Sequence, residues 1–126
     1  MFEIMVEDEF SAAHFLKLYD GSWEHRHGHD WKVAVTLRSQ GLDSIGVVAD
    51  FEMLKTHLKK VLAEFNEISM NEHPHFKGKV NTSTENIAKI IYDRLCRLVH
   101  SDNAKIVKVT VWETHDASAS FIAEGL

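Results

Sequence analysis

The sequence is poor in cysteine, in clustered positive charge and in long apolar runs. Its one cysteine, Cys96, excludes an internal disulfide, so we expect a protein of a reducing compartment and assign it to the cytoplasm. The formal net charge is −5, and Lys and Arg form no stripe, which argues against nucleic-acid or anionic-membrane partners. No apolar run approaches the ~18 residues of a spanning helix, and the start of the chain lacks the basic region of a signal peptide.

Histidine, in contrast, is abundant, with nine in 126 residues. The remaining composition, 44% hydrophobic and 26% charged, is ordinary for a soluble globular chain. This length is enough to bury a core and predicts a single domain over residues 1–126. The histidines are therefore the first place to look for chemistry.

Hydrophobic periodicity predicts the element order ββααββ, which is an α+β fold. Period-two alternation predicts two strands near the start and two at the end of the chain, and helical spacing predicts two helices between them. Because the strands are grouped without βαβ alternation, we expect one antiparallel sheet with both helices on one face. Asp50 is a predicted N-cap, and Thr82 precedes Glu85 by the spacing of a capping box. The predicted strands cover 2–14, 29–37, 104–113 and 118–124, the helices 51–65 and 82–99, and a polar loop 68–81.

The segment "SWEHRHGHDW" holds three of the histidines. His27 and His29 are two apart at the start of a strand, so their side chains point to the same face. If the first two strands pair as an antiparallel hairpin, His14 at the end of the first lies beside them. Three imidazoles with an open fourth position are the ligand set of a catalytic zinc ion. A lone His-x-His pair also arises by chance on a surface, and the spacing alone leaves both interpretations open.

Other residues near this segment have two interpretations each. Glu24, three residues before His27, is either a solvated turn residue or a general base whose pKa is set by a metal and by burial. His25 lies off the predicted metal face. Cys96, on the second helix, is expected to be a small core or boundary residue.

Five motifs, in order, resemble the 6-pyruvoyl-tetrahydropterin synthase and 6-carboxy-tetrahydropterin synthase family: "FSAAH", "HGH", "GVVADFEMLK", "TSTENIAKII" and "VWET". The resemblance runs from about Phe10 to Thr114. It implies the tunnelling fold, or T-fold, a four-stranded antiparallel sheet with two helices on one face. It also implies a homo-oligomer, typically a hexamer, with active sites between subunits.

The resemblance assigns roles to individual residues. It implies that His14, His27 and His29 bind Zn²⁺ and that Glu113 anchors a pterin. A pterin presents its 2-amino group and N3–H as parallel donors, which one carboxylate can accept. Two further matches are Thr84 and Glu85, which lie near the pterin in the family, although Glu85 also suits a capping role with Thr82.

Two positions depart from the family pattern. The usual catalytic cysteine is replaced by Trp23, but Glu24 fits the spacing of a minority group with glutamate, linked to cleavage of the dihydroneopterin side chain to 6-hydroxymethyl-dihydropterin. The usual Asp-His pair is replaced by Asn66 and Glu67. An Asn-Glu pair cannot act as a carboxylate-oriented imidazole. Glu67 itself, or His73 or His75 from the loop (residues 68–81), is then the candidate proton carrier, or the acid–base function is lost.

Three classes of function follow. The first, which we favour, is a zinc-dependent lyase acting on 7,8-dihydroneopterin triphosphate as a 6-carboxy- or 6-pyruvoyl-tetrahydropterin synthase, the former serving queuosine synthesis. Side-chain cleavage is the alternative reaction. The second is a pterin-binding paralogue without catalysis, and the third is a zinc-dependent activity on an unrelated small molecule.

Overall fold

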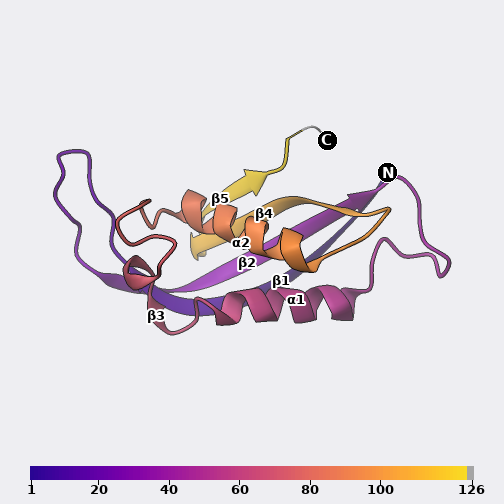
Figure 1. Cartoon of the computed structure of the whole chain (residues 1–126), viewed down its shortest axis with the longest axis horizontal. Coiled ribbons are helices and arrows are strands. Elements are labelled where there is room, and N and C mark those ends of the chain that lie inside the picture. The colour runs from indigo at the N-terminus through magenta and orange to yellow at the C-terminus, as the bar shows by residue number, and fades with distance from the viewer. Residues whose placement is uncertain (125–126) are drawn as a thin grey trace.

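The two longest strands form a hairpin that runs the length of the molecule. The computed structural model describes residues 1–124, in which β1 (Phe2–His14) pairs antiparallel with β2 (His27–Ser39) (Figure 1). Burial alternates along β1, as the sequence predicts, whereas in β2 all residues from Val33 to Leu37 are buried. The register places Phe2 opposite Ser39 and His14 opposite His27. The hairpin therefore brings the predicted metal-binding histidines to one end of the sheet.

The sheet contains one strand more than predicted. β4 (Lys105–Thr114) pairs antiparallel with β2, and β5 (Ala117–Ile122) pairs antiparallel with β4. The fifth strand, β3 (Ile68–Ser69), pairs parallel with β1, which gives the order β3-β1-β2-β4-β5. β3 and the short 3₁₀ helix η1 (Met70–Glu72) lie in the segment expected to be a loop. Two residues are too few to produce an alternating pattern, so periodicity could not reveal β3.

Both helices cover the same face of the sheet, as predicted (Figure 1). α1 (Phe51–Ala63) begins at Asp50, whose side chain accepts a hydrogen bond from the Glu52 N–H. The apolar stripes of both helices pack against the inner face of the sheet and form one core with it. The helix residues of this core are Leu54, Leu58, Val61, Leu62, Ile87, Ala88, Ile90, Ile91 and Leu95.

α2 (Thr84–Leu98) begins one residue later than the capping-box spacing predicts. Ser83, not Thr82, is the N-cap, and its hydroxyl accepts from the Asn86 N–H at 3.2 Å. Thr82 is instead 1% exposed and faces the interior. Both residue types cap helices well, so only tertiary packing decides between them. Cys96, expected in the core or at its boundary, is exposed on α2.

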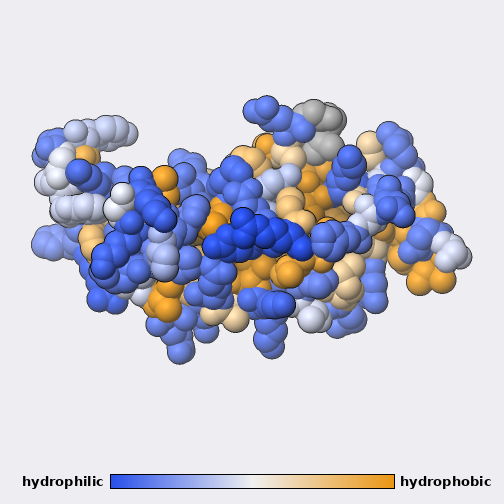
Figure 2. Space-filling view, viewed as in Figure 1, coloured by the Kyte–Doolittle hydropathy of each residue, from blue (hydrophilic) through white to orange (hydrophobic). Residues whose placement is uncertain are grey.

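The helix-bearing face is mostly hydrophilic, with apolar surface between the helices and beside the β2–α1 loop (Figure 2). Leu42 and Ile45 of that loop are 44% and 79% exposed. Within residues 1–124, no helix is long and apolar enough to cross a membrane.

Candidate metal and pterin site

Three histidines converge where the β1–β2 hairpin ends. His14 and His27 are paired across the two strands, and His29 lies two residues further along β2 on the same face. The ring centroid of His14 lies 4.5 Å from that of His27 and 5.6 Å from that of His29. His14 is 1% exposed, and the other two rings are partly buried. The strand geometry thus brings together the three residues that the sequence suggests as metal ligands.

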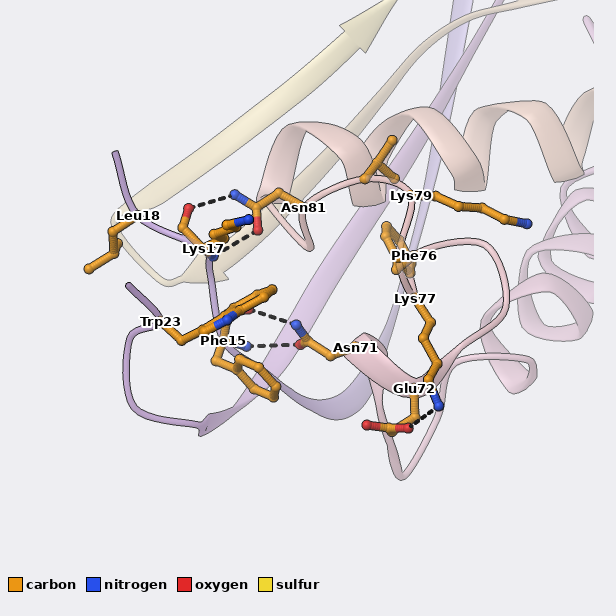
Figure 3. Close-up of a pocket in the computed structure, with 12 residues that line it drawn as sticks. Phe15, Lys17, Leu18, Trp23, Asn71, Glu72, Phe76, Lys77, Lys79 and Asn81 are labelled. Atoms are coloured by element: carbon orange, nitrogen blue, oxygen red, sulfur yellow. Dashed lines mark hydrogen bonds and ion pairs between the residues drawn. The ribbon is translucent and has the colours of Figure 1, made fainter. Parts of the chain in front are cut away.

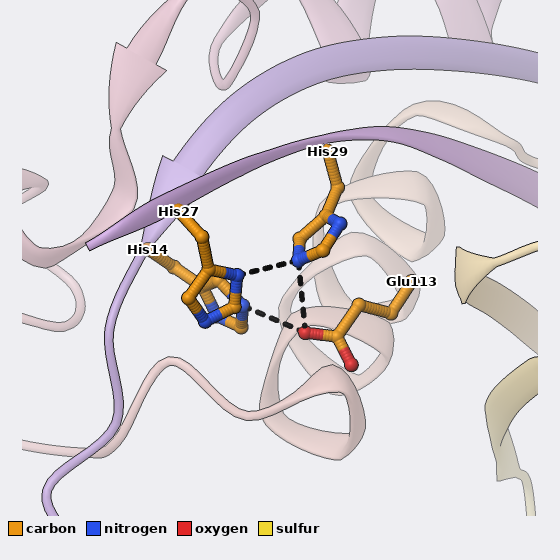
Figure 4. Close-up of side chains that lie close together, drawn as sticks. All are labelled: His14, His27, His29 and Glu113. Carbon is orange, nitrogen blue, oxygen red and sulfur yellow. Dashed lines mark hydrogen bonds and ion pairs between the residues drawn. The ribbon is translucent and has the colours of Figure 1, made fainter. Parts of the chain in front are cut away.

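A carboxylate completes this group, called here the histidine cluster: His14, His27, His29 and Glu113 (Figure 4). Glu113 lies near the end of β4, next to β2, and its Oε1 is 2.8 Å from His14 Nε2 and 3.3 Å from His29 Nε2. His27 Nδ1 and His29 Nε2 are 2.6 Å apart. One possible ligand atom from each residue lies within 4.8 Å of the others. Sequence reasoning assigned Glu113 to a pterin alone and missed its closeness to the histidines.

The hydrogen-bond partners of the rings leave lone pairs facing the centre. His14 Nδ1 lies 2.7 Å from the carbonyl oxygen of Thr82, and since a carbonyl only accepts, Nδ1 carries the proton. In the neutral ring, the Nε2 lone pair then faces Glu113 Oε1. Two acceptors at such a distance repel each other unless a proton or a cation lies between them. This donor set fits a divalent cation, and histidine nitrogens with one carboxylate are ligands that zinc accepts.

The other two rings have a similar arrangement. His27 Nε2 is 3.0 Å from Glu24 Oε1, so it donates to that carboxylate and leaves Nδ1 unprotonated in the neutral ring. Partial burial lowers the pKa of His29 below its usual range, although the nearby Glu113 acts in the opposite direction. The lowered pKa of His29 favours its neutral ring, whose lone pair is available for a metal ion.

Glu24 lies against the histidine cluster rather than in solvent. One oxygen, Oε1, accepts from the Leu16 backbone N–H at 2.8 Å and from His27. Partial burial by itself raises the Glu24 pKa, but the hydrogen bonds from His27 and Leu16 outweigh it, and the net pKa is lowered. Glu24 is therefore ionised near neutral pH and able to accept a proton next to the cluster.

Glu67, the second predicted catalytic residue, lies elsewhere. It is exposed in the turn after α1, where its backbone has a φ of +60° and its N–H donates to the Ser11 carbonyl at 2.6 Å. Within residues 1–124, its side chain makes no hydrogen bond or ion pair. Glu67 does share with His29 the lining of an open cavity of about 460 Å³.

The remaining candidate residues from the sequence, Thr84, Glu85, His73 and His75, also make no side-chain hydrogen bond or ion pair to the histidine cluster within residues 1–124. Thr84 and Glu85 lie in the first turn of α2. His73 Nε2 lies 2.8 Å from Glu64 Oε2, and His73 Nδ1 accepts from the His75 N–H. The loop histidines are therefore engaged with each other and with the end of α1.

A separate cavity of about 640 Å³ lies between the β1–β2 connection and the segment after η1 (Figure 3). Its walls combine aromatic and basic side chains, among them Phe15, Trp23 and Lys17. Trp23 is 56% exposed and packs edge-on against Phe15, with ring centroids 5.3 Å apart. Because Phe15 follows His14 directly, this cavity and the histidine cluster lie at the same end of the molecule.

Comparison with known proteins identifies the family of this chain. The family model of 6-pyruvoyl tetrahydropterin synthase matches residues 3–124. The chain belongs to this family. The 6-carboxy-5,6,7,8-tetrahydropterin synthase of Haemophilus influenzae is 30% identical over 135 residues, covering 90% of this chain and 94% of the relative.

Solved structures share the fold. The Caenorhabditis elegans 6-pyruvoyl tetrahydropterin synthase superimposes with a TM-score of 0.84 at 23% identity, covering 98% of this chain and 96% of that one. A Plasmodium vivax 6-pyruvoyltetrahydropterin synthase, in which a catalytic glutamate is replaced by alanine, gives 0.79 at 22% identity and covers 95% and 96%. Family membership thus supports a tetrahydropterin synthase-like enzyme with a T-fold.

Proposed function

We propose that this protein is a zinc-dependent lyase acting on the side chain of 7,8-dihydroneopterin triphosphate, as a 6-carboxy- or 6-pyruvoyl-tetrahydropterin synthase. The observation that carries the proposal is the convergence of His14, His27 and His29 with two carboxylates in a member of this family. The similarity to the Haemophilus 6-carboxy-tetrahydropterin synthase supports this reaction type.

Each residue of the site has a role in this proposal. His14, His27 and His29 hold Zn²⁺, which when bound supplies positive charge that polarises the substrate's side-chain oxygens and favours deprotonation nearby. Glu24, whose pKa is lowered, accepts the proton as general base. Glu113 would accept the two parallel donors of the pterin ring, one at each carboxylate oxygen. Its Oε2 makes no contact to His14 or His29, and its Oε1, which faces both rings, would be shared with the metal site.

The proposal extends to the residues and the assembly that the resemblance implies. Thr84 and Glu85 would approach the pterin from the start of α2, and the active sites would lie between subunits of a homohexamer. Light scattering of the purified protein measures the mass of the assembly directly. A monomer that turns over the pterin at full rate would contradict the interfacial site.

A second reaction is favoured by one observation. Trp23 occupies the position of the usual cysteine, and Glu24 contacts the histidine cluster at 3.0 Å. The similar Plasmodium vivax protein has a catalytic glutamate. A glutamate-type site of this kind would cleave the side chain to 6-hydroxymethyl-dihydropterin, with Glu24 moving the proton.

Mass spectrometry of products tests both reactions. Zinc-loaded protein is incubated with 7,8-dihydroneopterin triphosphate, beside metal-free protein and the His27→Ala variant as controls. We expect zinc-dependent turnover, and the product mass distinguishes 6-carboxy-, 6-pyruvoyl- and 6-hydroxymethyl-pterins. Tight pterin binding without turnover would instead indicate a binding paralogue. Absence of both would favour a zinc-dependent activity on an unrelated molecule.

A further inference from the structure

The segment that follows His14 leaves the sheet but keeps its backbone hydrogen bonds. Asn71 pairs with Phe15 as a strand would: its Oδ1 accepts from the Phe15 N–H at 3.0 Å, and its Nδ2 donates to the Phe15 carbonyl at 2.8 Å. Asn81 does the same two residues further on, with both bonds to Lys17 at 2.9 Å. The side chains of Asn71 and Asn81 therefore make the backbone hydrogen bonds that a neighbouring strand would make, the first at Phe15 and the second at Lys17.

Thr82 connects the first of these pairs to the ring of His14. Its buried hydroxyl donates to the Phe15 carbonyl at 3.1 Å and lies 3.3 Å from Asn71 Oδ1. Its own backbone carbonyl accepts from His14 Nδ1 at 2.7 Å. The Asn71–Phe15–Thr82 contacts thus hold the backbone after His14 and, through the Thr82 carbonyl, the orientation and tautomer of its ring.

We propose that Asn71 is a positioning residue of the metal site, acting through Phe15 and Thr82 on His14. Metal ligands need their lone pairs held within about 0.5 Å of the productive position. Residues that orient a ligand typically change metal affinity about 10- to 100-fold when replaced. This inference rests on the proposed metal site, and it adds a residue that contacts neither the metal nor a substrate.

Paired alanine variants test the inference. Asn71→Ala removes both bonds to Phe15, and Asn81→Ala removes the same two bonds at Lys17, without adding charge in either case. Zinc affinity is measured by competition with a chromophoric chelator, and the visible spectrum of the Co²⁺-loaded protein reports ligand geometry. We expect about a 10- to 100-fold loss of affinity and an altered cobalt spectrum for Asn71→Ala. We expect Asn81→Ala to keep the wild-type spectrum and to lose much less than the ~10-fold lower end of that range, since its side chain bonds Lys17 and not Phe15 beside His14.

A second pair of variants, at Thr82, tests the inference if circular dichroism shows that Asn71→Ala does not fold. Thr82→Val removes the hydroxyl but keeps the shape and the carbonyl, whereas Thr82→Ser retains the hydroxyl and should restore wild-type affinity and spectrum. The inference would be overturned if folded Asn71→Ala kept the zinc affinity and cobalt spectrum of the wild type. Where Asn71→Ala does not fold, the same result in Thr82→Val would overturn it. An equal loss in Asn81→Ala would overturn it too, because the effect would then be general loosening. A wild-type protein that binds no zinc would overturn the proposed function as well.

Discussion

The two carboxylates suggested by the sequence as proton carriers lie in very different surroundings. Glu24 is held by a backbone N–H and by His27, beside the histidine cluster. Glu67 is exposed in the turn that leads to β3, and its backbone rather than its side chain makes the contact to β1. A carboxylate becomes useful for catalysis when its neighbours fix its position and its pKa, and only Glu24 meets that condition here.

The largest expected effect is the loss of zinc on replacing His27, the histidine that contacts Glu24. His27→Ala should abolish stoichiometric zinc retention, with a loss of affinity beyond the ~10- to 100-fold typical of residues that merely orient a ligand. Metal analysis after gel filtration measures this, with exposed His25→Ala as the matched control. Full zinc occupancy in His27→Ala would disprove the ligand assignment and would remove the reason for placing Glu24 at a metal site.

A direct comparison of the two carboxylates comes next. Glu24→Gln keeps the size of the side chain but cannot accept a proton, so turnover should fall by about 10²- to 10⁴-fold while zinc stays bound. Glu67→Gln makes the same chemical change in the exposed turn and should leave turnover within about twofold. Steady-state kinetics on zinc-loaded protein measure both. The reverse ranking would identify Glu67 as the base and Glu24 as a residue that only orients His27.

The convergence of the three histidines was accessible from the sequence, because strand periodicity fixes which side chains share a face, whereas the position of Glu113 beside them was not. His14 and the His27–His29 pair needed only a hairpin register to meet. The contacts of Thr82 and Asn71 were not accessible, since they join segments 67 and 56 residues apart in the chain. Such pairings depend on how the loop packs in three dimensions, which local patterns do not encode. The same holds for β3, which is too short to show a pattern.

Glu113 provides a smaller test of how a carboxylate is used at this site. Glu113→Gln should weaken pterin binding by about 1.5 to 3 kcal/mol, the range for a hydrogen bond to a charged group. Fluorescence titration with a pterin measures this on zinc-loaded protein, with Glu67→Gln as control. Zinc affinity is measured on the same samples. If Glu113→Gln lost zinc affinity but kept pterin affinity, Glu113 would be a metal ligand rather than the pterin anchor.

The smallest expected effect concerns the backbone of Glu67. Its φ of +60° lies in the left-handed region, which costs most residues about 1 to 2 kcal/mol and which asparagine tolerates better. Glu67→Asn should therefore raise the free energy of unfolding by up to about 1 kcal/mol, measured from the urea midpoint, with turnover unchanged. Glu67→Gln keeps the unfavourable conformation and should remain near wild type. If Glu67→Asn lowered both stability and turnover, the Glu67 carboxylate would have a role that its exposed position does not suggest, and its contrast with Glu24 would weaken.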